Sequence, residues 1–206
     1  MDIYSTEEQQ AEAIKRFFRE NGVSLALGVV LGLGGLYGWK AYNQNQITTA
    51  ESASDAYTQL VEGGEVLGSA DTFIAEHKDT NYSALAAFVA AKEAVEKGQL
   101  DVASEKLSWI MNNVTNADLK ATATTRLARV QIAQQQYDQA LTTLNAKLAD
   151  SFTATVAELK GDIYTAQGDA NQARTAYQTA ADAGGLDNNP LLQIKLDDLA
   201  VTSPTA

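Results

Sequence analysis

The residue types that most often carry out catalysis are few or scattered in this chain of 206 residues. It has no cysteine, which excludes a thiol nucleophile, a cysteine metal site and disulfide bonds. The single histidine, His77, lies between Glu76 and Lys78, and we expect it to be a solvated residue in the last turn of a helix. Acidic residues are dispersed, and the motifs of serine hydrolases, phosphate-binding loops and zinc proteases are missing. We therefore expect no catalytic, cofactor or metal site, and no enzymatic activity.

Recognition of another polypeptide is the chemistry that the remaining side chains favour. Apolar and basic residues recur at helical spacing in two segments, so each set would share one face of a helix. The first set is Leu85, Phe88, Lys92 and Val95, and the second is Arg126, Arg129 and Ile132. Apolar side chains can hold those of an extended chain, and arginine can bind a carboxylate through two hydrogen bonds. The sequence leaves open the alternative that Phe88 and Val95 belong only to the hydrophobic core.

A repeat in the sequence predicts the helices that position these side chains. Its clearest copy has small, aromatic and turn residues at the spacing of a tetratricopeptide repeat, which it closely resembles. These residues are Gly161, Tyr164, Gly168, Ala173, Tyr177 and Ala180. The same frame recurs at Ala128 and Ala91, and a degenerate helix pair precedes it at 50–77. In repeats of this type the candidate groove residues lie on the inner face, which turns acidic in the third copy at Glu158 and Asp162.

Helix pairs of this kind bury their apolar faces only by stacking on one another. We therefore expect residues 40–206 to form a helical-repeat solenoid in an all-α protein. The leucines after Pro190 predict a final amphipathic helix that caps the stack.

Residues 23–39 form an uncharged segment, VSLALGVVLGLGGLYGW, that predicts a transmembrane helix. As a helix it would cover about 26 Å, slightly less than the ~30 Å hydrocarbon core, and Trp39, Lys40 and Tyr42 can extend it into the interface. A buried helix of a soluble domain would normally show a polar face, and this segment has none. The polar segment before the span is long, and no signal-peptide cleavage site closely follows it. We expect an uncleaved anchor.

The basic residues predict the orientation of this anchor. Lys15, Arg16 and Arg19 precede the span, whereas no Lys or Arg occurs between Lys40 and Lys78. The positive-inside rule then places residues 1–22 in the cytoplasm and the repeat domain in the periplasm of a bacterial inner-membrane protein.

The cytoplasmic segment has an apolar face of its own, at Ala11, Ile14, Phe17 and Phe18. Two interpretations stay open: an amphipathic helix on the inner leaflet that ends at 21–22, or a helix that runs straight into the span.

The span also carries glycines at a spacing that favours contact between helices. Gly28 and Gly32 form one GxxxG pair, and Gly34 and Gly38 form another. This spacing lets two helix backbones approach closely, so we expect a helix partner in the membrane, with a passive anchor as the alternative.

The charge of the outer domain excludes one class of partner. Residues 41–206 contain 11 Lys and Arg against 21 Asp and Glu, a net charge of −10. Such a domain repels nucleic acid and anionic headgroups, so we expect no nucleic-acid partner.

Several motifs along the chain resemble the YfgM family of Gram-negative bacteria, the ancillary subunits of the SecYEG translocon. They are the MDIY opening, AIKRFF at 13–18, the ENG before the span and the GW at its end, then RLARVQ at 126–131 and the Gly161 and Gly168-Asp169 repeat. The resemblance implies an inner-membrane protein with one span and a periplasmic repeat domain. It also implies association with SecYEG and with the periplasmic chaperone PpiD, and a role in passing emerging, unfolded proteins onward.

Two other classes of function stay open at the level of sequence. One is a structural scaffold of another envelope complex, for cytochrome maturation or cell-wall assembly, which would bind folded partners. The other is a membrane-tethered enzyme, for which the sequence offers no catalytic set.

Overall fold

The computed structural model describes residues 7–187 and 189–201, and within these ranges the chain is helical and contains no β-strand. The predicted all-α fold is therefore confirmed. The chain divides into two compact units, residues 1–52 and residues 53–206.

The described part of the first unit, residues 7–52, lies in a single helix, α1 (Glu7–Glu62), whose last residues belong to the second unit. This helix is long and apolar enough to cross a membrane. It continues through Gly22 and through Trp39 without a break. Of the two interpretations of the N-terminal segment, the structure has the one in which the helix runs straight into the span. The side-chain amide of Asn21 donates to the carbonyl of Phe17, one turn earlier, so it adds a hydrogen bond to the helix at the predicted break.

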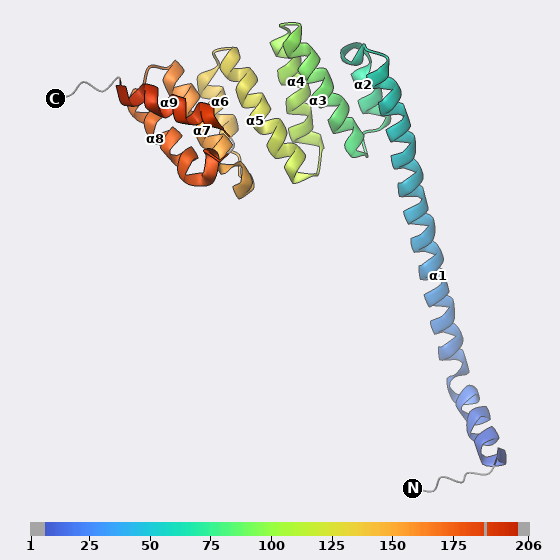
Figure 1. Ribbon diagram of the computed structural model, residues 1–206. Helices are drawn as coiled ribbons and strands as arrows, with labels where there is room; N and C mark the ends of the chain where they lie inside the picture. The colour runs from blue at the N-terminus through green and yellow to red at the C-terminus, as the bar shows by residue number, and fades with distance from the viewer. Residues whose placement is uncertain (1–6, 188, 202–206) are drawn as a thin grey trace. The chain divides into compact units, whose positions relative to one another are not determined.

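The second unit is the repeat domain, in which successive helices pack against their neighbours (Figure 1). The last residues of α1 pair with α2 (Val66–Glu76), and three further hairpins follow. They are α3 (Asn81–Glu96) with α4 (Leu100–Asn113), α5 (Ala117–Ala133) with α6 (Tyr137–Leu144), and α7 (Thr153–Ala166) with α8 (Ala170–Ala180). A short 3₁₀ turn, η1 (Asp150–Phe152), precedes α7, and a π-helical turn, η2 (Ala181–Gly185), follows α8. The chain then forms α9 (Pro190–Val201), which packs on α8 as the predicted capping helix.

The hairpin turns depend on one residue with a positive φ. Gly98 (φ 72°) and Gly168 (φ 81°) end the first helix of their hairpins, where a left-handed residue closes the last turn. The middle hairpin has Gln135 at this position with φ 61°. Glycine adopts this conformation without steric cost and other residues do not, so the middle turn is strained.

Small side chains let the paired helices approach closely. Alanines that are almost completely buried line the contacts of α3, α4 and α5, together with larger residues such as Leu107 and Ile110. In the last hairpin the ring of Tyr177 lies directly on Gly161, where an added Cβ would come within 2.3 Å of the ring. Ala173 and Ala180 are fully buried beside Tyr177. The predicted repeat residues therefore lie at the contacts between α7 and α8.

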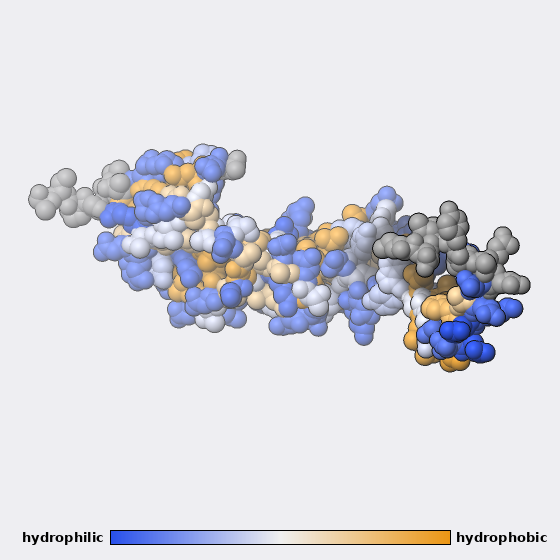
Figure 2. Space-filling view, turned by 90° about the horizontal axis from the view of Figure 1, so that it is seen from below, coloured by the Kyte–Doolittle hydropathy of each residue, from blue (hydrophilic) through white to orange (hydrophobic). Residues whose placement is uncertain are grey.

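The surface of the repeat domain is mainly hydrophilic on the face that Figure 2 shows, with apolar residues in separate patches. This distribution fits the −10 charge of residues 41–206. On this face, apolar contact with a partner is limited to these separate patches.

Candidate polypeptide-binding groove

A groove of ≈ 430 Å³ lies between α3 and α5, with α4 beneath it. Three buried side chains form its floor: Phe88 from α3, Leu107 from α4 and Val130 from α5. The other lining residues are Ala91, Lys92, Val95, Glu96, Leu100, Arg126, Arg129 and Ala133. We call this feature the α3/α5 groove. Its surface is apolar at the floor and charged at the rim, as in sites that hold an apolar group and orient it by a few polar contacts.

The rim of the α3/α5 groove carries three cations. The guanidinium carbon of Arg126 lies 4.7 Å from the centre of the Phe88 ring, which places a cation on an aromatic face. On the other side Lys92 pairs with Glu96 at 3.5 Å, and both side chains are exposed. Within the described part of the chain, neither Arg126 nor Arg129 forms an ion pair. Two guanidinium groups are thus available to an incoming carboxylate.

Five of the seven residues predicted for the groove line it together. They are Phe88, Lys92, Val95, Arg126 and Arg129. Leu85 is half-buried and does not line the groove, and Ile132 packs instead into the core formed by α5, α6 and α7. Ile132 shares a helix face with Arg129 but lies near the end of α5, where it packs against the cluster that contains Leu144 and Ile163.

The alternative that Phe88 and Val95 are only core residues fits Phe88 in part and does not fit Val95. Phe88 is buried and belongs to the largest core cluster, yet its ring also forms the groove floor. Val95 is 43% exposed at the rim. Sequence analysis missed Leu100 and Leu107, which reach the groove from α4. Leu107 occupies the position of Tyr177 in the repeat frame, which is typical of a core residue. The pattern therefore did not predict that Leu107 also lines the groove.

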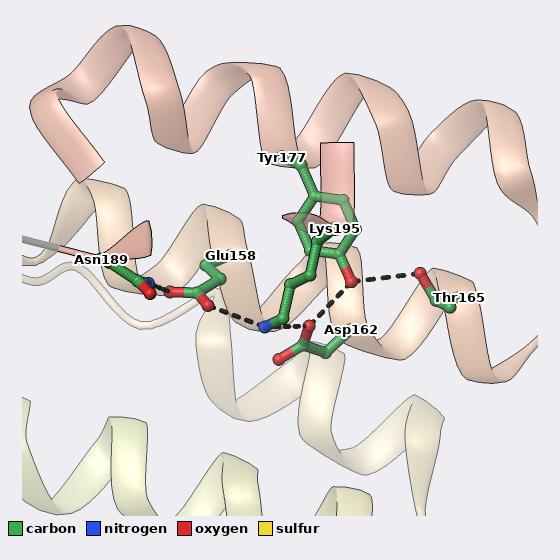
Figure 3. Close-up of polar contacts among 6 residues, drawn as sticks. All are labelled: Glu158, Asp162, Thr165, Tyr177, Asn189 and Lys195. Carbon is green, nitrogen blue, oxygen red and sulfur yellow. Dashed lines mark hydrogen bonds and ion pairs between the residues drawn. The ribbon is translucent and has the colours of Figure 1, made fainter. Parts of the chain in front are cut away.

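In the α7/α8 hairpin, two acidic residues of α7 contact Lys195 of α9 (Figure 3). The Nζ atom of Lys195 lies 2.7 Å from Glu158 Oε1 and 2.7 Å from Asp162 Oδ1. The hydroxyl of Tyr177 donates to Asp162 at 2.8 Å, and Thr165 lies 3.2 Å from the same hydroxyl. Asn189 donates to Glu158 at 2.8 Å. The acidic pair that the sequence placed on the inner face is thus paired with Lys195 and hydrogen-bonded within the domain.

Two pKa shifts follow from this network. Burial lowers the pKa of Lys195, but hydrogen bonds to Asp162 and Glu158 outweigh burial, and the net pKa lies above 10.5. Burial, assisted by the charge of Asp162, raises the pKa of the Tyr177 hydroxyl well above its usual value. Both groups therefore keep their protons over the physiological range and act as hydrogen-bond donors to the acidic pair.

The remaining predicted residues have simpler surroundings. His77 ends α2, and its half-buried ring lies 4.6 Å from that of Phe73, so it packs on the core and is less solvated than expected. The glycines of the two GxxxG pairs have no atom of the described chain within 4 Å of an added Cβ, so α1 is open at both pairs. Among the described residues, no group of three or more His, Asp or Glu side chains could hold a metal ion.

Comparison with known proteins gives one consistent result. Residues 15–201 match a family of tetratricopeptide repeat-like domains. A protein of Escherichia coli (strain K12), named ancillary SecYEG translocon subunit, is 39% identical over 98% of this chain and 100% of its own length. The chain belongs to the family of ancillary SecYEG translocon subunits.

Relatives with the same name extend this family to other bacteria. The protein of Haemophilus influenzae is 30% identical over 94% of this chain and 97% of its own length. That of Neisseria gonorrhoeae is 27% identical over 97% of this chain and 100% of its own length. No solved structure matches the chain significantly.

Membership in the ancillary SecYEG translocon subunit family confirms the resemblance seen in the sequence. A tetratricopeptide repeat-like domain in proteins of this name supports a role in protein interaction. Together with the apolar N-terminal helix, it fits an inner-membrane protein with a single span.

Proposed function

We propose that this protein is a membrane-anchored interaction module that associates with the SecYEG translocon and binds polypeptides in the α3/α5 groove. The family supports the translocon as partner, since four relatives share the name ancillary SecYEG translocon subunit. One structural observation supports the groove: an apolar floor lies beside two guanidinium groups that form no ion pair with any described residue, in a domain of net charge −10. We further propose that the module connects the translocon to a periplasmic chaperone of the PpiD type and passes emerging proteins to it.

The groove suits an extended segment better than a folded surface. Its ≈ 430 Å³ accommodate individual side chains, and its floor is recessed between two helices. A flat partner surface would reach the charged rim but not Phe88 or Leu107. This geometry favours the proposed role with unfolded polypeptides over that of a scaffold for folded proteins.

The experiment for this proposal is the double substitution Phe88→Ala with Arg129→Ala in the full-length protein. Truncating one well-packed interface residue typically costs ~2 kcal/mol of binding free energy, about a thirtyfold loss of affinity. We expect at least this loss for an unfolded client polypeptide or for the PpiD-type chaperone, with folding checked by circular dichroism. If the folded double mutant binds both with unchanged affinity, the groove is not the binding site.

The proposed topology has the N-terminus in the cytoplasm and the repeat domain in the periplasm. The basic cluster of residues 15–19 before the span, and the lack of basic residues between Lys40 and Lys78, support it. Protease added to intact spheroplasts should then degrade residues beyond about 45. If this region survives while the N-terminal segment is cleaved, the orientation in the membrane is the opposite of the one proposed.

We also propose that the glycine pairs of the span pack on transmembrane helices of a partner. No side chain of the described chain covers these glycines, and leucine at Gly32 and Gly34 would block close approach at both pairs while favouring insertion. Replacing both residues with leucine should weaken copurification with the translocon from mild detergent. Unchanged copurification would mean that the contact lies outside the membrane.

A further inference from the structure

We infer that the α3/α5 groove is selective and binds segments in which a carboxylate lies directly next to one large apolar side chain. This inference rests on the proposed function, in which the groove holds a polypeptide. It adds the chemical class of the segment that is recognised.

The size of the groove sets the number of apolar side chains that it can hold. Its walls include Ala91 and Ala133, whose small side chains leave the floor of Leu107 and Val130 accessible. A volume of ≈ 430 Å³ lies near the lower end of the ~300–1,000 Å³ typical of ligand pockets. The groove therefore accepts one large apolar anchor, with room for a neighbouring residue.

The charges around the groove favour a carboxylate beside this anchor. Arg126 is held over the Phe88 ring, and Arg129 lies one turn further along α5. The charge of Lys92 is largely compensated by Glu96, whereas the two guanidinium groups have no acidic partner among the described residues. A carboxylate next to apolar surface would form charge-assisted hydrogen bonds with them, which are among the strongest in proteins.

The position of Glu96 gives the groove a direction. It follows Phe88 by eight residues, about 12 Å along the axis of α3. A carboxylate at the Glu96 end would meet an ion pair without net charge, whereas one at the end formed by Arg126 and Arg129 would be attracted. The acidic group of the ligand should thus bind near these arginines, with the apolar anchor between them and Val95.

Acidic segments are an unusual target for a domain with a charge of −10, because its overall field repels them. Binding must then come from the local arginines, which restricts acidic ligands to this groove. A fatty acid also combines a carboxylate with an apolar group. However, the exposed rim residues Lys92, Val95 and Arg129 leave the groove open to solvent, which favours a side chain over a long acyl chain.

The test uses the full-length protein in phosphatidylcholine nanodiscs and fluorescein-labelled octapeptides, with binding measured by fluorescence anisotropy. The central probe has the sequence Gly-Ser-Gly-Phe-Glu-Gly-Ser-Gly, and matched probes replace Phe by Ala, or Glu by Gln or Lys. Hydrogen bonds to charged groups contribute enough that the Phe-Glu probe should bind at least about tenfold more tightly than the Phe-Gln probe. Arg129→Glu should reverse the preference toward the Phe-Lys probe. Lys147→Gln, which removes an exposed cation outside the groove, should leave every affinity unchanged.

Failure of this inference can be distinguished from failure of the proposed function. Equal binding of the Phe-Glu and Phe-Gln probes, with both weakened by Phe88→Ala, would overturn the selectivity and leave the groove as a polypeptide site. Where Phe88→Ala unfolds the domain, Val95→Ser serves in its place because Val95 is already 43% exposed. Probe binding that none of the groove substitutions changes would overturn both proposals. If dodecanoate displaces the labelled probe at lower concentrations than any unlabelled peptide does, the groove binds acyl carboxylates and the inference is overturned.

Discussion

Gly161 determines how closely α7 and α8 can approach, because the Tyr177 ring lies where its side chain would be. In Gly161→Ala the new Cβ would come within 2.3 Å of two ring atoms, so the ring or the helix must move. Overpacking of this kind typically costs ~1–3 kcal/mol of the free energy of unfolding. We expect the thermal midpoint of a fragment of residues 45–206 to fall by several degrees.

Gly68→Ala is the matched control for this substitution. Gly68 lies in α2 with no atom within 4 Å of an added Cβ, and alanine is the better helix former. Its thermal midpoint should stay the same or rise. An equal loss in both variants would show that Gly161 has no special role in the packing.

Gln135 offers a stabilising substitution at the turn between α5 and α6. A non-glycine residue in the left-handed region, such as Gln135, raises the free energy of the folded state by ~1–2 kcal/mol. Glycine avoids this cost, but its larger loss of conformational entropy on folding costs ~0.5–1 kcal/mol more than that of alanine. Gln135→Gly should therefore stabilise the domain by roughly 0.5–1 kcal/mol. Gln135→Ala keeps the Cβ and should give no such gain in chemical denaturation. A similar gain from both variants would mean that the side chain of Gln135, not its φ angle, limits stability.

At the scale of secondary-structure elements, Lys195 attaches α9 to the last hairpin. Lys195→Met would leave Glu158 and Asp162 near each other without a cation, although partial exposure of all three side chains reduces the cost. We expect a loss of about 1–2 kcal/mol in the free energy of unfolding. Lys92→Met, at a fully exposed pair, should change stability by less than about 0.5 kcal/mol.

The contact of Lys195 with Glu158 and Asp162 predicts that the stability of the domain depends on pH in the alkaline range. The pKa of Lys195 is raised above 10.5 in the folded state, so its contribution is complete below the unfolded pKa and is lost as pH rises through the folded pKa. The stability difference between wild type and Lys195→Met should therefore be constant at neutral pH, and it should decrease at alkaline pH as the pH rises through the raised pKa of Lys195. A difference that persisted unchanged at higher pH would show that lost packing, not lost charge, causes the destabilisation.

The helices could largely be predicted from the sequence, because helix formation and pairing follow from local spacing. The frame of Gly161, Gly168 and Ala173 identified the last hairpin, and Pro190 marked the start of α9. The continuity of α1 could not be predicted with the same certainty, since Asn21 and Gly22 weaken a helix without ending it.

Contacts between distant elements were harder to predict. The ion pairs of Lys195 with Glu158 and Asp162 join residues more than 30 positions apart, and no periodicity encodes them. Ile132 was assigned to the groove from helical spacing alone, which does not distinguish the groove face from the face toward the next hairpin. Five groove residues were nevertheless identified, because α3 and α5 occupy equivalent positions in the repeat.

At the scale of the whole molecule, the chain combines an apolar N-terminal helix with an acidic repeat domain that has one apolar, arginine-bordered groove among its described residues. In the proposed function, the anchor would keep the repeat domain at the membrane surface, where the effective concentration of a translocating polypeptide would be high. Even a modest affinity of the groove for short segments would then be sufficient for the proposed function.

The most direct test of the central claim is site-specific photocrosslinking of the full-length protein in bacterial inner membranes during protein export. A photoreactive residue at Val95, on the rim of the α3/α5 groove, should crosslink to exported polypeptides or to the chaperone partner. The same residue at Gln139, exposed on α6 and outside the groove, should give no such products, and Arg129→Glu should abolish those from Val95. Equal crosslinking from Gln139, or products from Val95 that Arg129→Glu leaves unchanged, would contradict the account.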